Sequence, residues 1–435
     1  METETIQFRA SAEAVNNALE IVSVVDPLAV TEQGQSGFFF MVGKKKEGPD
    51  AGKDFCWIYS KDAIHAARTE FPISDVVVTG GGQRQFVYLV DYLESFKYVD
   101  GEVVFDVMND WENTAFTVKW GTVGGLSTER STIDPRAGNT IDDRLEAATD
   151  PHTYRTILLK EALQYGAKFL ASESDRNARD EFKMLNIYDS ILDPIGKGDG
   201  TLHATDGYQH FFFYCDNFKG KGLQVNIKNL KLLDRFLAKC GPEVVICAGN
   251  EMTFAMSSDK SRILGWSRHT KKPLEFKTIP MKWDSHVLRV RDRELLLKQL
   301  RFMRSEMPKT RDKIRVEYNS VPNQVQFRIL VDSKVVSLPI DVIPVEGSES
   351  RDYKYDVHID QLIGLFNEVK SSIIEFRMFR MEDHGGAKGG AGFRTVDEYW
   401  LDQDGKIVGG SGMIPDPANG QVYQCKVTRF MPNKI

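Results

Sequence analysis

The chain of 435 residues lacks the features that mark several large classes of protein. It contains no run of about 18 apolar residues, which excludes a membrane-spanning helix, and its polar first residues, METETIQFRA, do not resemble a signal peptide. Its five cysteines are scattered, and no two of them have the spacing of a zinc-binding CxxC pair. We therefore expect a cytoplasmic protein with buried, reduced thiols and no membrane partner.

The common catalytic motifs are also missing, since the sequence has no G-x-S-x-G elbow, no HExxH helix and no kinase set. His203 and His210 flank a turn, but only Asp206 stands near them as a further ligand, so we predict no metal site. The glycine-rich run Gly385–Gly392 includes Lys388 but lacks the GxxxxGK(S/T) pattern of a phosphate-binding loop, which favours a flexible insertion. We expect a protein that is not an enzyme and needs no cofactor. A nucleotide-handling enzyme that uses the glycine run is the less favoured alternative.

The apolar pattern repeats one order of elements three times: a strand, a helix, several strands, a second helix and several closing strands. A period of about 135 residues is that of a repeated domain rather than of a solenoid. We predict three domains, at residues 1–134, 151–282 and 283–435, and we interpret the polar stretch Asp134–Asp150 as a linker. Two helices packed on antiparallel sheets in each domain give an α+β fold class.

Apolar residues at helical spacing predict these helices at Ser11–Val25, Gln85–Lys97, Lys160–Ala171, Asn226–Cys240, Arg291–Ser305 and His358–Val369. Ser11 is a candidate N-cap for the first of them. Between the helices we expect antiparallel strands, among them a hairpin over Leu202–Cys215 and a last strand over Tyr423–Arg429.

Positive charge is concentrated on some of these helices, although the whole chain has a formal net charge of −6. Cations spaced three and four residues apart share one helix face, opposite the leucines, as in the helix Asn226–Cys240. A solvated face is the plain interpretation, but three such helices in an acidic chain favour contact with the phosphates of duplex DNA, independent of its sequence. The predicted DNA-facing residues are Lys160, Lys168, Lys228, Lys231, Arg235, Lys239, Lys298, Arg301 and Arg304. The helix Ser11–Val25 has no Lys or Arg, so we expect little positive potential from the first domain.

The stretch Thr201–Cys215, TLHATDGYQHFFFYC, reads as two strands joined by an Asp-Gly turn. It follows the segment Phe182–Asn186, and the chain ends in Phe430–Ile435, FMPNKI. In this order these pieces resemble the bacterial DNA polymerase III β sliding clamp family, in which a Leu-Asn strand, an Ala-Thr-Asp-Gly hairpin and a Met-Pro terminus form a pocket for partner peptides. The resemblance covers essentially the whole chain and is clearest from Phe182 to Pro280. It implies three repeated clamp domains, a ring made by two chains, and helices that line its hole.

The resemblance also implies which residues form the pocket for partner peptides. These are Leu185, Thr205, Gly207, Tyr208, Gln209, His210, Pro273, Lys277, Thr278, Phe430, Met431, Pro432, Asn433, Lys434 and Ile435. The family's usual His-Arg-Leu after the hairpin glycine is Tyr-Gln-His here, and its usual Met-Pro-Met-Arg-Leu ending is Met-Pro-Asn-Lys-Ile. We therefore expect a more polar pocket and a divergent family member, for which a phage or plasmid origin is one interpretation.

By this resemblance the chain is expected to be a processivity factor that encircles duplex DNA and tethers the replicative DNA polymerase. An ATP-driven clamp loader would open the ring and use the same pocket. The homodimer would close head to tail, the first domain of one chain meeting the third of the next near Met303 and Met307. The alternative is a clamp-fold protein that binds a partner but does not load on DNA, which the uncharged first helix supports.

Overall fold

The computed structural model describes residues 4–27, 36–80, 85–89, 98–109, 114–120, 125–128, 140–188, 200–207, 209–268, 286–290, 292–319, 324–331, 334–344, 353–370, 374–380, 391–410, 415 and 421–433. The chain forms two compact units. The first contains Met1–Thr156 and Lys231–Thr270, and the second contains Ile157–Leu230 and Lys271–Ile435. No helix in the described ranges is long and apolar enough to cross a membrane.

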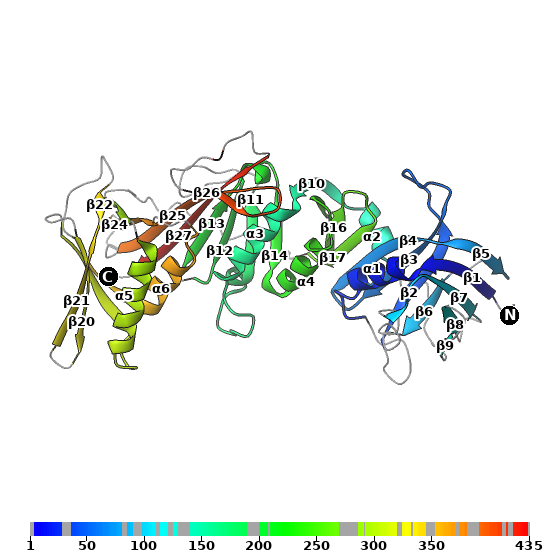
Figure 1. The fold of residues 1–435 in the computed structure, drawn as a ribbon, viewed down its shortest axis with the longest axis horizontal. Helices are drawn as coiled ribbons and strands as arrows, with labels where there is room; N and C mark the ends of the chain where they lie inside the picture. The colour runs from blue at the N-terminus through cyan, green and yellow to red at the C-terminus, as the bar shows by residue number, and fades with distance from the viewer. Residues whose placement is uncertain are drawn as a thin grey trace. The chain divides into compact units, whose positions relative to one another are not determined.

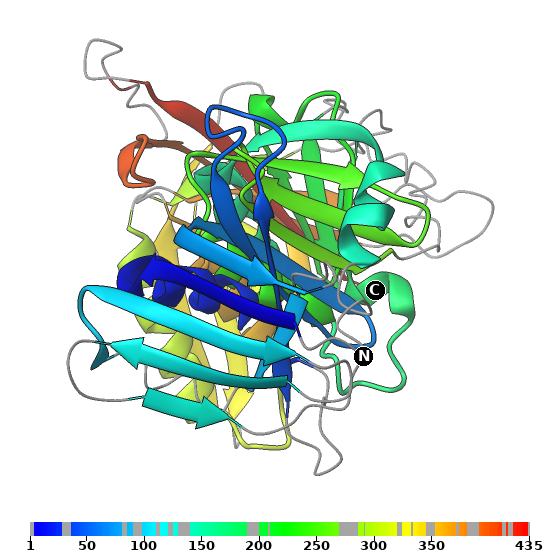
Figure 2. The same ribbon diagram turned by 90° about the vertical axis from the view of Figure 1, so that its right-hand side faces the viewer.

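The first unit begins with a five-stranded antiparallel sheet in the order β5-β1-β7-β8-β9. Its strands are β1 (Glu4–Ser11), β5 (Ser74–Thr79), β7 (Glu102–Asn109), β8 (Thr114–Trp120) and β9 (Gly125–Thr128). Helix α1 (Ala12–Val22) follows β1 directly, and Figure 2 shows it in dark blue beside these strands. Its apolar face, which includes Val15 and Leu19, is buried, as the helical spacing predicted. Ser11 is the N-cap residue, although its side chain makes no capping hydrogen bond.

A second, eight-stranded sheet of this unit has the order β10-β15-β16-β17-β4-β3-β2-β6. Its strands are β2 (Gly37–Lys44), β3 (Asp54–Lys61), β4 (His65–Pro72), β6 (Gln85–Leu89), β10 (Thr149–Arg155), β15 (Glu243–Ala248), β16 (Met252–Ser257) and β17 (Arg262–Ser267). Strand β17 pairs with β4, with Gly265 opposite Ala66. Strands of the predicted first and second domains are therefore joined in one continuous sheet, and the predicted domain boundaries stay a prediction.

The second unit contains a ten-stranded sheet in the order β14-β11-β12-β13-β27-β25-β24-β18-β22, with β26 paired to β25 (Figure 1). Its strands are β11 (Met184–Tyr188), β12 (Thr201–Thr205), β13 (His210–Tyr214), β14 (Leu223–Asn226), β18 (His286–Val290), β22 (Ile343–Pro344), β24 (Ile374–Arg380), β25 (Ala391–Leu401), β26 (Ile407–Gly410) and β27 (Tyr423–Asn433). Helix α3 (Thr156–Ala167) packs on this sheet, because Tyr165 lies edge-on against Phe211 of β13 with the ring centroids 5.3 Å apart. The helix begins at Thr156, four residues before the predicted Lys160.

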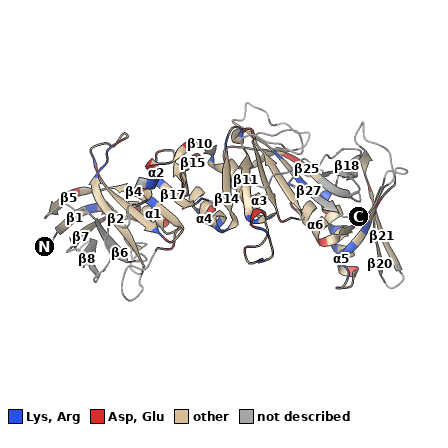
Figure 3. Ribbon diagram, turned by 180° about the vertical axis from the view of Figure 1, so that it is seen from behind, with Lys and Arg blue, Asp and Glu red and all other residues tan. Residues whose placement is uncertain are grey.

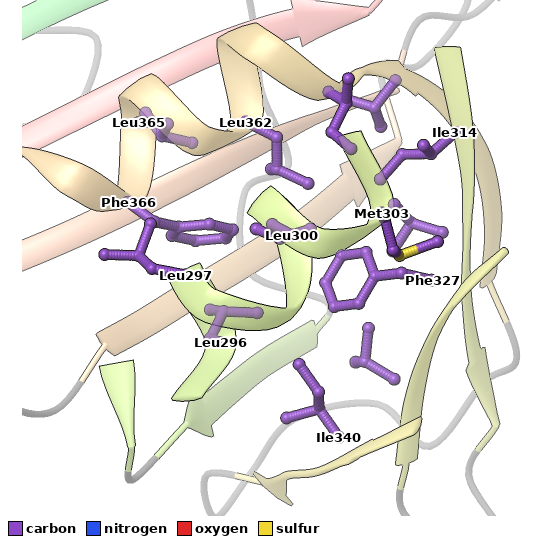
Figure 4. Packing of buried hydrophobic residues seen from close by; sticks show 14 of the residues in the cluster. Leu296, Leu297, Leu300, Met303, Ile314, Phe327, Ile340, Leu362, Leu365 and Phe366 are labelled. Carbon is purple, nitrogen blue, oxygen red and sulfur yellow. The ribbon is translucent and has the colours of Figure 1, made fainter. Parts of the chain in front are cut away.

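The remaining sheet of the second unit has the order β21-β20-β19-β23 and carries two helices. Its strands are β19 (Lys313–Asn319), β20 (Gln324–Val331), β21 (Lys334–Asp341) and β23 (Tyr353–His358), and the helices α5 (Arg293–Glu306) and α6 (Ile359–Asn367) lie beside each other. Figure 4 shows Leu300 of α5 and Leu362 of α6 packed together over Phe327. Met303 and Met307 are 0% and 7% exposed, so their side chains belong to this core, and a contact between chains near them stays a prediction.

The predicted helix Gln85–Lys97 is wrong in its first part, because Gln85–Leu89 is strand β6. This strand pairs with β2, with Phe86 opposite Phe40 and Leu89 opposite Gly37. Its sequence, QFVYL, is rich in aromatic and β-branched residues, which suit an extended strand, and the pairing with a neighbour outweighed the helical spacing. The rest of the predicted helix, 90–97, lies outside the described residues.

The predicted linker Asp134–Asp150 contains helix α2 (Thr140–Glu146) instead of only irregular chain. Ile141 is 2% exposed and packs in a core cluster with Phe39 and Phe254. Asp142, interpreted as linker charge, accepts a hydrogen bond at 2.6 Å from Arg68 and another at 2.9 Å from the Tyr59 hydroxyl. Buried Ile141, the Arg68–Asp142 pair and a second pair, Arg144 with Glu251 at 3.5 Å, dock this segment, which is too short for helical periodicity to detect.

Candidate nucleic-acid and partner interfaces

The hairpin of β12 and β13 is fixed by hydrogen bonds within its own turn. Thr205 stands opposite His210, and the Thr205 hydroxyl accepts from the Gly207 amide at 3.0 Å and donates to the Gln209 carbonyl at 2.7 Å. The Gln209 amide donates to the Asp206 carboxylate at 2.6 Å. These bonds satisfy the polar groups of the tight turn, as expected for an Asx-type turn.

Gly207 is required in this turn on two counts. Its φ of 90° lies in the left-handed region that other residues rarely adopt. A Cβ atom at this position would also lie 2.7 Å from the Phe182 ring. The predicted Asp-Gly turn is therefore confirmed, and the glycine also allows Phe182 to pack beneath it.

Two histidines of this hairpin face each other across its strands. His203 Nε2 lies 3.3 Å from His210 Nδ1, and the rings are stacked with centroids 5.6 Å apart. Burial lowers the pKa of His210 to about 4 and lowers the pKa of His203 well below its ordinary value, so both rings are neutral at pH 7. Within the described ranges, no group of three or more His, Cys, Asp or Glu is arranged to hold a metal ion.

The hairpin lies directly beside the last strand of the chain. Strand β13 pairs with β27 from His210 opposite Phe430 to Tyr214 opposite Lys426. On its other side β27 pairs with β25, and there Met431 stands opposite Phe393 and Pro432 opposite Gly392. The predicted last strand, Tyr423–Arg429, is therefore too short, because Met431 and Pro432 also belong to β27.

The structure thus brings part of the predicted partner pocket together. Leu185 and Thr205 are each 1% exposed, Gln209 and His210 are half-buried, and Gly207 is exposed. Leu185 lies under helix α3, where a Cβ on Gly166 would be 2.6 Å from its Cδ2 atom. The backbone of Phe430, Met431, Pro432 and Asn433 lies in β27, next to the hairpin. Tyr208, Pro273, Lys277, Thr278, Lys434 and Ile435 lie outside the described residues.

A buried ion pair lies on the face of the same sheet that α3 covers. The side chains of Arg429 in β27 and Asp397 in β25 are both 0% exposed, and their nearest charged atoms are 3.8 Å apart. Arg429 also donates to the Tyr165 hydroxyl and, at 2.5 Å, to the Glu368 carbonyl, while the Lys370 amide donates to Asp397 at 2.6 Å. The group joins α3, the end of α6 and two strands. The alternation of Cys425, Val427 and Arg429 on one strand face could have indicated this inward arginine from the sequence.

A pocket of about 440 Å³ opens between α3, α5 and the end of α6. Its lining includes Glu161, Tyr165, Arg293 and Lys370, and Lys370 is paired with Glu161, which also accepts a hydrogen bond from the Tyr399 hydroxyl at 2.7 Å. Among the residues that the structure describes, none of those predicted for the partner-peptide pocket lines it.

The predicted basic face is exposed on α4 (Ile227–Leu237), whose Lys and Arg positions Figure 3 colours blue. Lys228, Lys231 and Arg235 are exposed, and none of them has an ion-pair partner among the described residues. On the opposite side Leu233 is 0% exposed and Leu237 is 1% exposed. The predicted separation of charged and apolar faces on this helix is therefore confirmed.

The other predicted cations are more strongly engaged within the chain. Lys168 pairs with Glu368 at 2.5 Å, Arg304 with Asp360 at 2.9 Å, Lys239 with Glu20, and Arg301 donates to Asn367 at 2.9 Å. Lys160 is half-buried on α3 and Lys298 is exposed on α5. The cations that remain available to an external anion are therefore concentrated on α4.

No protein-family model matches the chain, and no curated protein matches it in sequence. Solved structures do match over its full length. The DNA polymerase III subunit beta from Pseudomonas aeruginosa is 13% identical with a TM-score of 0.63, and the match covers 99% of this chain and 100% of that one. The DNA polymerase sliding clamp from Caulobacter crescentus is 11% identical with a TM-score of 0.66, over 99% and 100% of the two chains. The DNA polymerase III beta subunit from Thermotoga maritima is 12% identical with a TM-score of 0.58, over the same shares. The resemblance seen in the sequence is thus confirmed, and the chain has the α+β fold of the DNA polymerase III β sliding clamps, with its three repeated domains.

Proposed function

We propose that this protein is a DNA sliding clamp, a non-enzymatic processivity factor that encircles duplex DNA and tethers a DNA polymerase. The observation that carries the proposal is the full-length match to solved sliding clamps, from the first sheet to the last strand. A ring that holds DNA needs every domain of the fold, and a match over 99% of the chain leaves none of them out.

The basic face of α4 supports the DNA part of this proposal. Lys228, Lys231 and Arg235 are long, exposed cations on one helix. Such cations release the counterions of DNA phosphates when they approach a duplex, which gives affinity without base recognition. A surface of this kind lets a protein stay on DNA while it moves along it.

The hairpin and β27 support the partner part of the proposal. One solved Caulobacter crescentus clamp has polyethylene glycol bound to a putative β-motif tethering region, and a Pseudomonas aeruginosa clamp is bound to griselimycin. In this chain we place the peptide site where β13 begins and β27 ends, around Gln209, His210 and the backbone of Phe430–Asn433. A polymerase and an ATP-driven clamp loader would present extended peptides there.

The ring would form from two chains that meet head to tail, since a heterologous contact that closes leaves no free edge. Light scattering on the protein without DNA tests this step. The proposal predicts a mass of twice the chain's 49.3 kDa at micromolar concentration. A strictly monomeric mass at that concentration would contradict it.

A clamp-fold protein that binds partners without loading on DNA is the second candidate, and helix α1 favours it. This helix carries Glu13 and Glu20 and no Lys or Arg, so it adds no positive potential. The two candidates differ in one property, which is salt-sensitive retention on closed circular DNA. Retention supports the sliding clamp, and peptide binding without retention supports the second candidate.

A further inference from the structure

Cys215 and Cys425 lie opposite each other where the hairpin meets the last strand. The pairing of β13 with β27 ends with Tyr214 opposite Lys426, and one further step places Cys215 opposite Cys425. The Cys215 amide points away from β27, because it donates to the Gly200 carbonyl at 3.3 Å. The two cysteines therefore form a non-hydrogen-bonded pair, the kind in which cross-strand side chains are closest.

Their side chains share one face of the sheet. Cys215 is 2% and Cys425 is 0% exposed. Each shares its strand face with a buried residue two positions away, Phe213 on β13 and Val427 on β27. Interaction between the two thiols shifts the pKa of each, in opposite directions. Cα atoms in such a cross-strand pair are about 4.5 Å apart, within the range that a disulfide spans.

The two cysteines differ from the others in the chain because each shifts the pKa of its partner. The interaction with Cys425 lowers the pKa of Cys215, and the interaction with Cys215 raises the pKa of Cys425, so Cys215 is expected to lose its proton first. The charged groups nearby are Asp216 and Lys221 at Cys215, and Glu161 and Lys370 at Cys425. Because the thiolate is the nucleophile, Cys215, the thiol with the lowered pKa, is the one expected to react first with an oxidant.

Two residues that influence Cys425 also line the pocket of about 440 Å³. Glu161 and Lys370 line that pocket and also act electrostatically on the Cys425 thiol. Tyr399, which donates to Glu161, stands opposite Cys425 in the pairing of β25 with β27.

We propose that Cys215 and Cys425 are a redox modification site, at which a hydroperoxide converts two neighbouring thiols into one disulfide. The Cys215 thiolate attacks one peroxide oxygen, the O–O bond breaks, and a sulfenic acid and water form with one added proton. The Cys425 sulfur then attacks the Cys215 sulfur, the S–O bond breaks, and the hydroxyl group leaves as water with the Cys425 proton. The sum is two thiols and one hydrogen peroxide giving one disulfide and two waters, and an external dithiol reverses it.

The bond would tie the predicted second domain to the predicted third. It would close a loop from residue 215 to residue 425, which restricts the unfolded chain far more than the folded one. Oxidised protein is therefore expected to melt at a higher temperature than reduced protein. The inference rests on the cysteine geometry and is independent of the proposed function.

The test exposes the reduced full-length chain to a small excess of hydrogen peroxide, blocks remaining thiols by alkylation, and maps the peptides by mass spectrometry. We expect a peptide cross-linked through Cys215 and Cys425 as the main product, which disappears after dithiothreitol and is absent from C215S and C425S. The control variant is C240S, since Cys240 is the one half-exposed cysteine and would be oxidised first if exposure alone decided. It should keep the cross-link.

Peptide mapping of the unaltered chain shows whether Cys215 and Cys425 form a disulfide, even where a variant folds poorly. A melting temperature raised by several degrees on oxidation, and unchanged in C425S, would support the site. Oxidation that falls first on Cys240, or sulfinic acid at Cys215 while Cys425 remains open to alkylation, would overturn it.

Discussion

Phe430 lies directly opposite His210 in the antiparallel pairing of β27 with β13. This pair joins the hairpin of the predicted second domain to the last strand of the predicted third. It is the first pair in the register of β13 with β27, beside the place where we propose the partner-peptide site. Because β27 continues past it to Asn433, Met431–Asn433 are held by sheet pairing on the side of β25.

The partner site is best tested by a point substitution. Deleting Met431–Ile435 would also remove the pairing of Met431 with Phe393, so a loss of binding could reflect a damaged sheet. Met431→Ala keeps the backbone of β27. Because a few buried anchors give most of the affinity of such sites, we expect it to weaken a polymerase-derived peptide by about 2 kcal/mol. The control is Tyr423→Ala at the opposite end of β27. Equal peptide affinity in the two variants would place the partner site elsewhere.

Replacing Lys228, Lys231, Arg235 and Lys239 with Ala should weaken retention on DNA and flatten its dependence on salt. Each phosphate that the variant no longer neutralises should reduce the slope of log affinity against log salt by about 0.9. Lys239 is paired with Glu20, so it should contribute less than the other three. The matched control removes the same charge elsewhere, at Lys46, Lys53, Lys309 and Lys313, which are exposed outside the helices. If the control weakens retention as much as the α4 variant does, net charge alone is responsible.

The neutral His203–His210 pair predicts that stability falls in acid. Because burial lowers both pKa values in the folded protein, the unfolded chain binds protons first as the pH falls below about 6.5. The contribution of His210 is full above that pH and is lost as the pH falls to about 4, at about 1.4 kcal/mol per pH unit. Denaturant melts of the original chain and His210→Gln should differ in slope over this range and run parallel above pH 7. Parallel curves throughout would disprove the assignment.

Breaking the buried Arg429–Asp397 pair should destabilise the second unit strongly. Arg429→Met leaves Asp397 charged and buried, which costs about 3–5 kcal/mol in the free energy of unfolding. The control is Arg315→Met, which breaks the exposed pair with Asp356 at 2.7 Å and should cost less than about 1 kcal/mol. Chemical denaturation measures the free energy of unfolding of both variants. Equal losses of stability would mean that Arg429 and Asp397 do not form a buried pair.

Much of the fold followed from sequence periodicity. The helices α1, α4, α5 and α6 and the hairpin at Gly207 stand where apolar spacing and turn chemistry predicted them. In each case the local pattern and the tertiary partner favour the same structure.

The errors arose where tertiary contacts outweighed local pattern. The residues of β6 also fit helical spacing, which predicts a helix. Only their pairing with β2 shows that they form a strand. Helix α2 was missed because its stability comes from Ile141 and from the Arg68–Asp142 pair, which no local signal encodes. Within the candidate sites, residue spacing identified the basic face of α4, whereas the Arg429 cluster and the opposed cysteines depend on strand register.

The central claim is that this protein encloses DNA, and DNA topology tests it most directly. The protein is loaded onto a nicked circular plasmid with its cognate loader and ATP, isolated by gel filtration, and the plasmid is then cut once by a restriction enzyme. A protein that encloses DNA should stay on the circle, leave after linearisation, and be retained again when both ends are blocked by bound streptavidin. Equal retention on circular and open linear DNA, or no retention on the circle, would contradict it.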